Sequence, residues 1–91
     1  MDLYDLLEKV DSKESFLQFL KALKEDKMDE DKKEVEQPSP PYGSGANGWE
    51  NGSIVNFLDA IEAFGVSSKL IPQEPSWKNF ALLIYAGKFY E

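Results

Sequence analysis

The sequence predicts an all-α protein, a single small domain of three to four helices with a long Pro/Gly-rich loop between the second and third. Apolar residues recur at helical spacing in separate segments, and no run alternates in the manner of a strand. Proline and glycine are concentrated in one central stretch. A chain of 91 residues fits one domain with a compact core.

The first two predicted helices cover residues 2–10 and 13–25. Helical spacing relates the apolar residues of the first: Leu3, Leu6, Leu7 and Val10. The segment Asp11-Ser12-Lys13-Glu14 then predicts a break and a new N-cap. The second helix carries one apolar stripe, formed by Phe16, Phe19, Leu20 and Leu23 and widened by Leu17. This stripe predicts a core helix.

Residues 25–36 form an acidic run that is almost entirely charged, with Met28 and Val35 as its clearly apolar members. Spaced charges of opposite sign support helix continuation, so we expect a charged helical extension that enters solvent and then frays. Two interpretations of this extension remain open. It is either a docking arm for a partner or a plain solvated segment.

Residues 37–52 contain three prolines and four glycines, which predicts a loop without regular structure. Loops of this length are uncommon in small domains and are often functional or disordered. The aromatic residues Tyr42 and Trp49 lie in this loop. They either anchor the loop on the core, which we favour, or contact a ligand.

Two further helices follow the loop. The third is expected over residues 54–64, with Ser53 as its N-cap and Gly65 as its end. The fourth is expected over residues 76–86, opening at Pro75-Ser76 and ending at Gly87. Residues 66–74 connect them, with Leu70 and Ile71 turned inward.

The formal charge of −7 limits the choice of partners. All ten cations are lysines and the chain has neither arginine nor histidine, which argues against nucleic-acid binding. The acidic surface favours a basic protein partner, although simple solvation explains it equally well. The chain has no cysteine, no stretch long enough to span a membrane and no secretory pattern at its start, so we expect a cytoplasmic location.

Four short motifs have weak support. Residues 43–48 satisfy GxGxxG, but no strand precedes them and no helix opens from them. Residues 29–31 begin like a calcium loop, but Glu34 replaces the required glycine. A PxxP spacing at residues 38–41 lacks a flanking arginine, and the sequon at residues 51–53 is better explained as a turn and N-cap. We therefore expect no bound cofactor and no metal.

The same residue inventory argues against an enzyme. There is no histidine for acid–base chemistry near neutral pH, no nucleophile elbow and no metal-ligand cluster. We expect a non-catalytic protein-binding module. The alternative is a small hydrolase or ligand-binding domain that uses carboxylates near Glu50.

Two parts of the chain resemble a known family. The first runs from Tyr42 through Trp49-Glu50-Asn51 into the helix after Ser53, and the second runs from Trp77 to Tyr90-Glu91. They resemble the DUF7660-like family of small bacterial proteins of unknown function. The resemblance implies no established activity. By analogy, small acidic proteins of this sort sometimes resemble immunity proteins that neutralise toxins.

This resemblance also defines a candidate interaction surface, formed by Tyr42, Trp49, Glu50, Asn51, Trp77 and Tyr90. In the interpretation that we favour, these residues build the fold. Trp49 packs against the third helix, Glu50 or Asn51 bonds to loop or helix-start amides, and Trp77 lies across from Trp49 with Tyr90 nearby. In the alternative, the aromatic residues anchor a partner.

Overall fold

A computed structural model describes residues 2–40, 45–69 and 74–90 of the chain. Within these ranges the chain forms four helices and no strand, which confirms the predicted all-α class. The helices are α1 (Leu3–Glu8), α2 (Lys13–Glu36), α3 (Ile54–Ser67) and α4 (Trp77–Phe89). The inward placement expected for Leu70 and Ile71 concerns residues outside the described ranges.

Each helix begins at a polar residue whose side chain accepts a hydrogen bond from the amide three residues further on. These N-caps are Asp2, Ser12, Ser53 and Ser76. At Ser12 the bond is reciprocal, because Ser15 Oγ in turn accepts from the Ser12 amide. N-caps satisfy amides that have no partner inside the helix, which explains why the predicted helix starts hold.

The predicted helix ends at Gly65 and Gly87 are wrong, because α3 continues to Ser67 and α4 to Phe89. Both glycines lie where α3 and α4 pack together. A Cβ on Gly87 would lie 2.6 Å from Cε1 of Phe57, and a Cβ on Gly65 would lie 3.1 Å from Cδ2 of Leu83. At these positions glycine allows close helix packing and does not terminate a helix.

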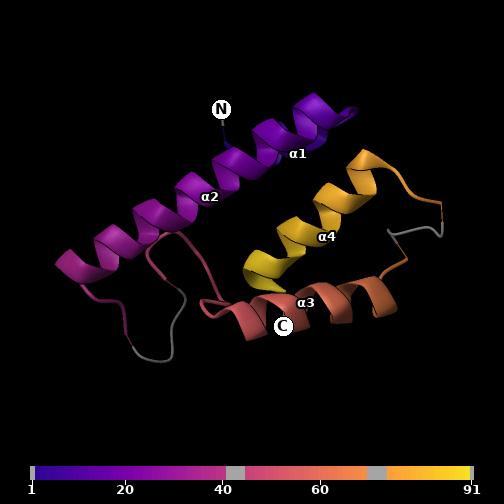
Figure 1. The fold of residues 1–91 in the computed structure, drawn as a ribbon. Coiled ribbons are helices and arrows are strands. Elements are labelled where there is room, and N and C mark those ends of the chain that lie inside the picture. Colours follow the sequence, from indigo (N-terminus) through magenta and orange to yellow (C-terminus); the bar gives the residue numbers. More distant parts are fainter. Residues whose placement is uncertain (1, 41–44, 70–73, 91) are drawn as a thin grey trace.

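Helix α4 is the centre of the molecule. It contacts α1, α2 and α3, whereas no Cα atom of α2 comes within 8 Å of one in α3. Figure 1 shows α4 lying between α2 and α3, with the loop leaving the end of α2 and returning beside that helix before it reaches α3. The two outer helices are thus held apart by the central one.

The buried core lies where α1, α2 and α4 meet. Its buried members are Leu7, Val10, Phe19, Leu23 and Ala81, and the loop adds Trp49. Phe19 also makes an edge contact with Tyr85, with ring centroids 6.0 Å apart. The short helix α1 therefore supplies part of the same core as the long helices.

Candidate functional site

The second half of α2 holds the loop through a buried carboxylate. The Glu30 side chain lies under the loop, and the residue is only 3% exposed. Its Oε1 accepts hydrogen bonds from the amides of Asn47, at 3.0 Å, and Trp49, at 3.2 Å. A buried carboxylate is costly unless charge-assisted bonds compensate it, and these two amides supply them.

Glu34 binds the loop one turn further along α2. It accepts from the amide of Ser39 at 2.7 Å, from the Ser39 hydroxyl at 2.5 Å and from the amide of Ala46 at 2.8 Å. These bonds favour the charged form, and the Ser39 hydroxyl contributes most to holding the pKa of Glu34 below its ordinary value. Glu34 thus joins the start of the loop to the turn at residues 45–48.

Asn47 binds α2 through both ends of its amide side chain. Its Nδ2 donates to the carbonyl of Asp26 and to Oδ2 of Asp29, both at 3.0 Å. Its Oδ1 accepts from Lys33 Nζ at 2.9 Å. The bond from Asn47, followed by that from Lys33, lowers the pKa of Asp29.

Residue 45 of the loop packs against the buried Glu30 carboxylate, where only glycine fits without a shift of that side chain. A Cβ on Gly45 would lie 2.1 Å from Glu30 Oε1, which leaves no room for a side chain. Gly48 has a φ of +86°, in the left-handed region, and its amide donates to the carbonyl of Gly45. Within the described part of the GxGxxG pattern, the amides of Ala46 and Asn47 thus donate to the α2 carboxylates Glu34 and Glu30, where a nucleotide site would present them to a phosphate.

Trp49 links the loop to three helices. The residue is 7% exposed, its Nε1 donates to Asp26 Oδ2 at 2.8 Å, and its ring stacks on Phe57 of α3 at 6.2 Å. Lys88 of α4 also donates to Asp26 Oδ2, at 2.8 Å, and lies 5.7 Å from the Trp49 ring centroid. The predicted packing of Trp49 against the third helix is therefore present.

Asn51 ties the loop to the end of α4. Its Nδ2 donates to the carbonyls of Gly87, at 3.2 Å, and Tyr90, at 2.9 Å, and the amides of Glu50 and Asn51 both donate to the carbonyl of Lys88. The expectation that Glu50 or Asn51 bonds to loop or helix-start amides is wrong for Asn51. Its partners are carbonyls at a helix end, which need donors.

The candidate interaction residues do not form one continuous surface. Trp77 is exposed at the start of α4 and contacts Phe16, whereas Trp49 lies near Lys88 at the far end of that helix. Eleven residues of helix separate these ends by about 16 Å, so the expected pairing of Trp49 with Trp77 is wrong. The expected closeness of Trp77 and Tyr90 is wrong for the same reason.

The remaining members of that set are also dispersed. The Tyr90 ring makes an edge contact with Phe64 of α3, at 5.2 Å, and the side chain of Glu50 is exposed. Tyr42 lies outside the described residues. Trp49 and Asn51 therefore stabilise the fold, as the favoured interpretation predicts.

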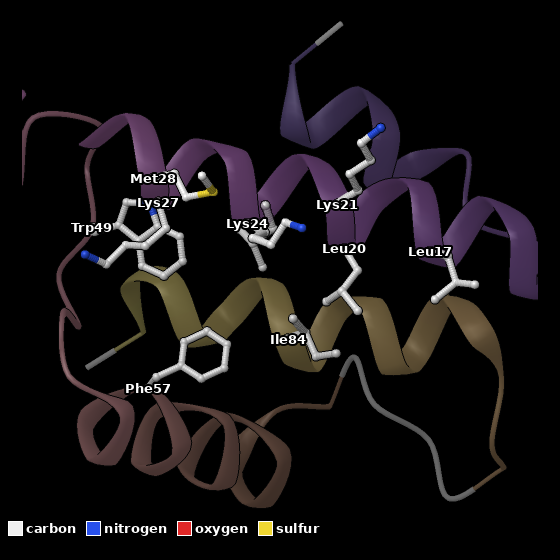
Figure 2. A pocket seen from close by; sticks show the side chains of 10 residues that line it. Leu17, Leu20, Lys21, Lys24, Lys27, Met28, Trp49, Phe57 and Ile84 are labelled. Carbon is white, nitrogen blue, oxygen red and sulfur yellow. The ribbon is translucent and has the colours of Figure 1, made fainter. Parts of the chain in front are cut away.

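An open apolar groove of about 580 Å³ lies between α2 and α3. Figure 2 shows the side chains of α2 along one edge, Phe57 of α3 on the other and Ile84 of α4 between them. Trp49 stands at one end of the groove and Leu17 at the other. This groove follows from the packing, because α4 keeps α2 and α3 apart without filling the space.

Sequence reasoning missed both the groove and the carboxylates that bind the loop. The loop-binding carboxylates Asp26, Glu30 and Glu34 follow Phe19 and Leu23 at intervals of three and four residues. They therefore continue the core stripe of the helix. Their helical spacing from the core residues is the signal that could have predicted that these carboxylates face inward.

The acidic side chains of residues 29–31, which begin like a calcium loop, bind different partners. Glu30 binds loop amides, Asp29 pairs with Lys33 at 2.9 Å and Asp31 pairs with Lys27. Among the described residues, no group of three or more acidic side chains is placed to hold a metal ion. Pro41 of the PxxP spacing lies outside the described ranges, and Ser53 of the sequon caps α3.

No helix in the described part of the chain is long and apolar enough to cross a bilayer. No curated protein and no solved structure matches the sequence. The family model DUF7660, a family of unknown function, matches residues 12–91. Because this match runs from the N-cap of α2 through all of α4, the protein belongs to the DUF7660 family.

Proposed function

We propose that the protein is a non-catalytic protein-binding module, and that the groove between α2 and α3 is its binding surface. The observation that supports this proposal is the exposure of large apolar side chains along the groove. On α2 alone, Leu17 is 48% exposed and Met28 is 62% exposed, and Leu20 lies exposed between them. Contiguous exposed apolar surface is typical of interaction sites.

The groove also has the shape and chemistry of such a site. Its lining includes side chains that the fold already holds, such as Ile84 and the buried Trp49. Met28 at its edge is flexible and polarisable, so it adapts to different partners. A second, smaller hollow shares Trp49 and Phe57 with the groove and extends the surface to Ile54 at the start of α3.

The groove supports binding better than the acidic arm does. The inward carboxylates of residues 25–36 bind the protein's own loop, so a basic partner would compete with bonds such as that from the Asn47 amide to Glu30. If the bound partner is a toxin, the same binding function would make the protein an immunity protein. As its location we propose the cytoplasm, which the absence of cysteine supports.

A hydrolase built on Glu50 has less support. The Glu50 side chain is exposed, and it lines neither the groove nor any of three further hollows among the described residues. An acid–base pair works best when its carboxylates flank a partly dry cavity that holds the substrate. The geometry around Glu50 therefore gives this alternative no particular support.

A displayed peptide library tests the binding proposal. We expect the purified protein to enrich peptides whose binding shifts the amide NMR signals of groove residues such as Leu20 and Phe57. Leu20→Glu is expected to abolish this binding, whereas Val35→Glu, on the same helix but outside the groove, is expected to preserve it. Peptides that shift only signals outside the groove, or no enrichment at all, would contradict the proposal.

A further inference from the structure

The edge of the groove has the opposite charge to the molecule as a whole. The chain carries seventeen acidic residues and ten lysines, yet the groove lining contains three lysines and no carboxylate. These lysines are Lys21, Lys24 and Lys27, all on the α2 edge. From this edge we infer that the occupant of the groove is an acidic amphipathic helix of a partner protein, an inference that rests on the proposed binding function.

Two of the three lysines are available to a partner. Lys27 pairs with Asp31 and lies 3.8 Å from Glu30, so its charge is already compensated. Lys21 and Lys24 are exposed, and neither forms an ion pair with a described residue. Because they are three residues apart on one helix, they lie about one turn from each other on the α2 edge of the groove.

The length of the groove suits a helix. Leu17 and Met28, which bound the α2 edge, are eleven residues apart, or about 16 Å along the helix axis. That span corresponds to about three turns of a partner helix, enough for apolar anchors at positions i, i+4 and i+7. Such a helix would lie between α2 and α3 and supply the contact that these two helices do not make with each other.

The charges determine which amphipathic helix fits. Carboxylates beside the apolar stripe of the occupant would lie near Lys21 and Lys24, whereas basic residues there would meet like charges. No carboxylate of α3 lines the groove, and Asp59 lines a separate hollow with Asn56 and Tyr90. A second copy of this chain is the other possible occupant, and the oligomeric state measured below distinguishes it from a partner helix.

The probe is a displayed library of 14-residue helical peptides with fixed apolar anchors. The flanking positions are randomised among Glu, Gln and Lys. We expect the wild-type protein to enrich Glu at these positions and Lys21→Glu/Lys24→Glu to enrich Lys. The dissociation constant of a Glu-rich peptide should rise roughly tenfold in the double variant, and less at high salt.

The matched control is Lys32→Glu/Lys69→Glu, which changes the net charge equally at two exposed lysines outside the groove lining. We expect it to keep the preference for Glu. Peptides that bind the groove without any preference for Glu would contradict the acidic helical occupant but not the proposed binding function. The absence of any peptide that binds the groove would contradict both proposals. A dimer seen by sedimentation velocity and lost in Leu20→Glu would assign the groove to a second copy and overturn this inference.

Discussion

At the residue scale, Gly45 of the loop packs directly against the Glu30 carboxylate of α2. A methyl group on residue 45 would overlap the Glu30 carboxylate, whose nearest oxygen lies 2.1 Å from the ideal Cβ position. Because this carboxylate is buried and bound to two amides, it cannot move without losing those bonds. We expect Gly45→Ala to lower the free energy of unfolding by about 1–3 kcal/mol, measured by urea denaturation.

Gly52→Ala provides the control, because no heavy atom lies within 4 Å of the Cβ position there. Its effect is expected to stay within about 0.5 kcal/mol, since the position is open and its backbone is not in the left-handed region. Equal effects at the two positions would show that the general properties of glycine in the loop, and not the Glu30 contact, determine the result.

The buried Glu30 carboxylate shows which contacts of a single residue can be predicted from the sequence and which cannot. Charged residues usually indicate solvent, so both interpretations of residues 25–36 place Glu30 in an extension that enters solvent, although it lies in phase with Phe19 and Leu23 and is buried. Its partners, the amides of Asn47 and Trp49, are seventeen and nineteen residues further along. Helical periodicity contains no information about where a loop returns, so this pairing required the structure.

At the element scale, the loop should respond to acid. The pKa values of Asp29 and Glu34 are lowered, so their contribution to loop stability is complete above their ordinary values of 3.8 and 4.5 and is lost as the pH falls through the lower values of the folded state. We expect the amide of Ala46, which donates to Glu34, to lose hydrogen-exchange protection as the pH falls below about 4.

Glu34→Gln and Glu36→Gln make the matched comparison, because both positions lie in the last turn of α2. In Glu34→Gln the protection of the Ala46 amide should already be reduced at pH 6 and should change little on acidification. In Glu36→Gln it should follow the wild-type curve, since Glu36 is exposed. A wild-type curve in Glu34→Gln would mean that general acid unfolding governs the loop.

The packing of α3 on α4 depends on a glycine within a helix. Alanine is the better helix former by about 1 kcal/mol, so the substitution gains propensity at both Gly65 and Gly87. At Gly87 the methyl group would meet the ring of Phe57, at 2.6 Å, and that ring is held by its stack on Trp49. We expect Gly87→Ala to destabilise the protein by about 1–3 kcal/mol in urea denaturation.

Gly65→Ala is the internal comparison. There the nearest atom is the tip of the Leu83 side chain, at 3.1 Å, which needs to move only slightly. We expect a change within about 1 kcal/mol of neutral, because the gain in helix propensity offsets the contact. Equal destabilisation by both substitutions would contradict the specific role of Phe57.

The helices themselves were the most predictable elements. Their starts follow local chemistry, since Ser12, Ser53 and Ser76 each cap the helix that they precede. Their ends depend on tertiary packing, because Gly65 and Gly87 match the local signal for a stop but lie at a helix contact. The groove was unpredictable for a related reason: Leu17 and Leu20 look like core residues until the distance between α2 and α3 is known.

At the scale of the whole molecule, α1 packs into the same core as α2 and α4 although it precedes the region matched by the family. Leu7 is only 1% exposed and belongs to the same cluster as Phe19 and Ala81. A helix of six residues is not stable alone in water, so α1 depends on this packing and the core depends on α1. We expect Leu7→Ala to lower the free energy of unfolding by about 2–5 kcal/mol.

The cooperativity can be tested by following the same unfolding with two probes. Tryptophan fluorescence reports on Trp49 in the loop, provided that Trp77→Phe removes the second indole, and circular dichroism reports on all helices. In a single core, Leu7→Ala shifts both transitions equally, whereas Tyr4→Ala, at an exposed position of α1, shifts neither by more than about 0.5 kcal/mol. A Trp49 transition unchanged by Leu7→Ala would mean that α1 unfolds independently, and that the loop and the groove beside it rest on α2, α3 and α4 alone.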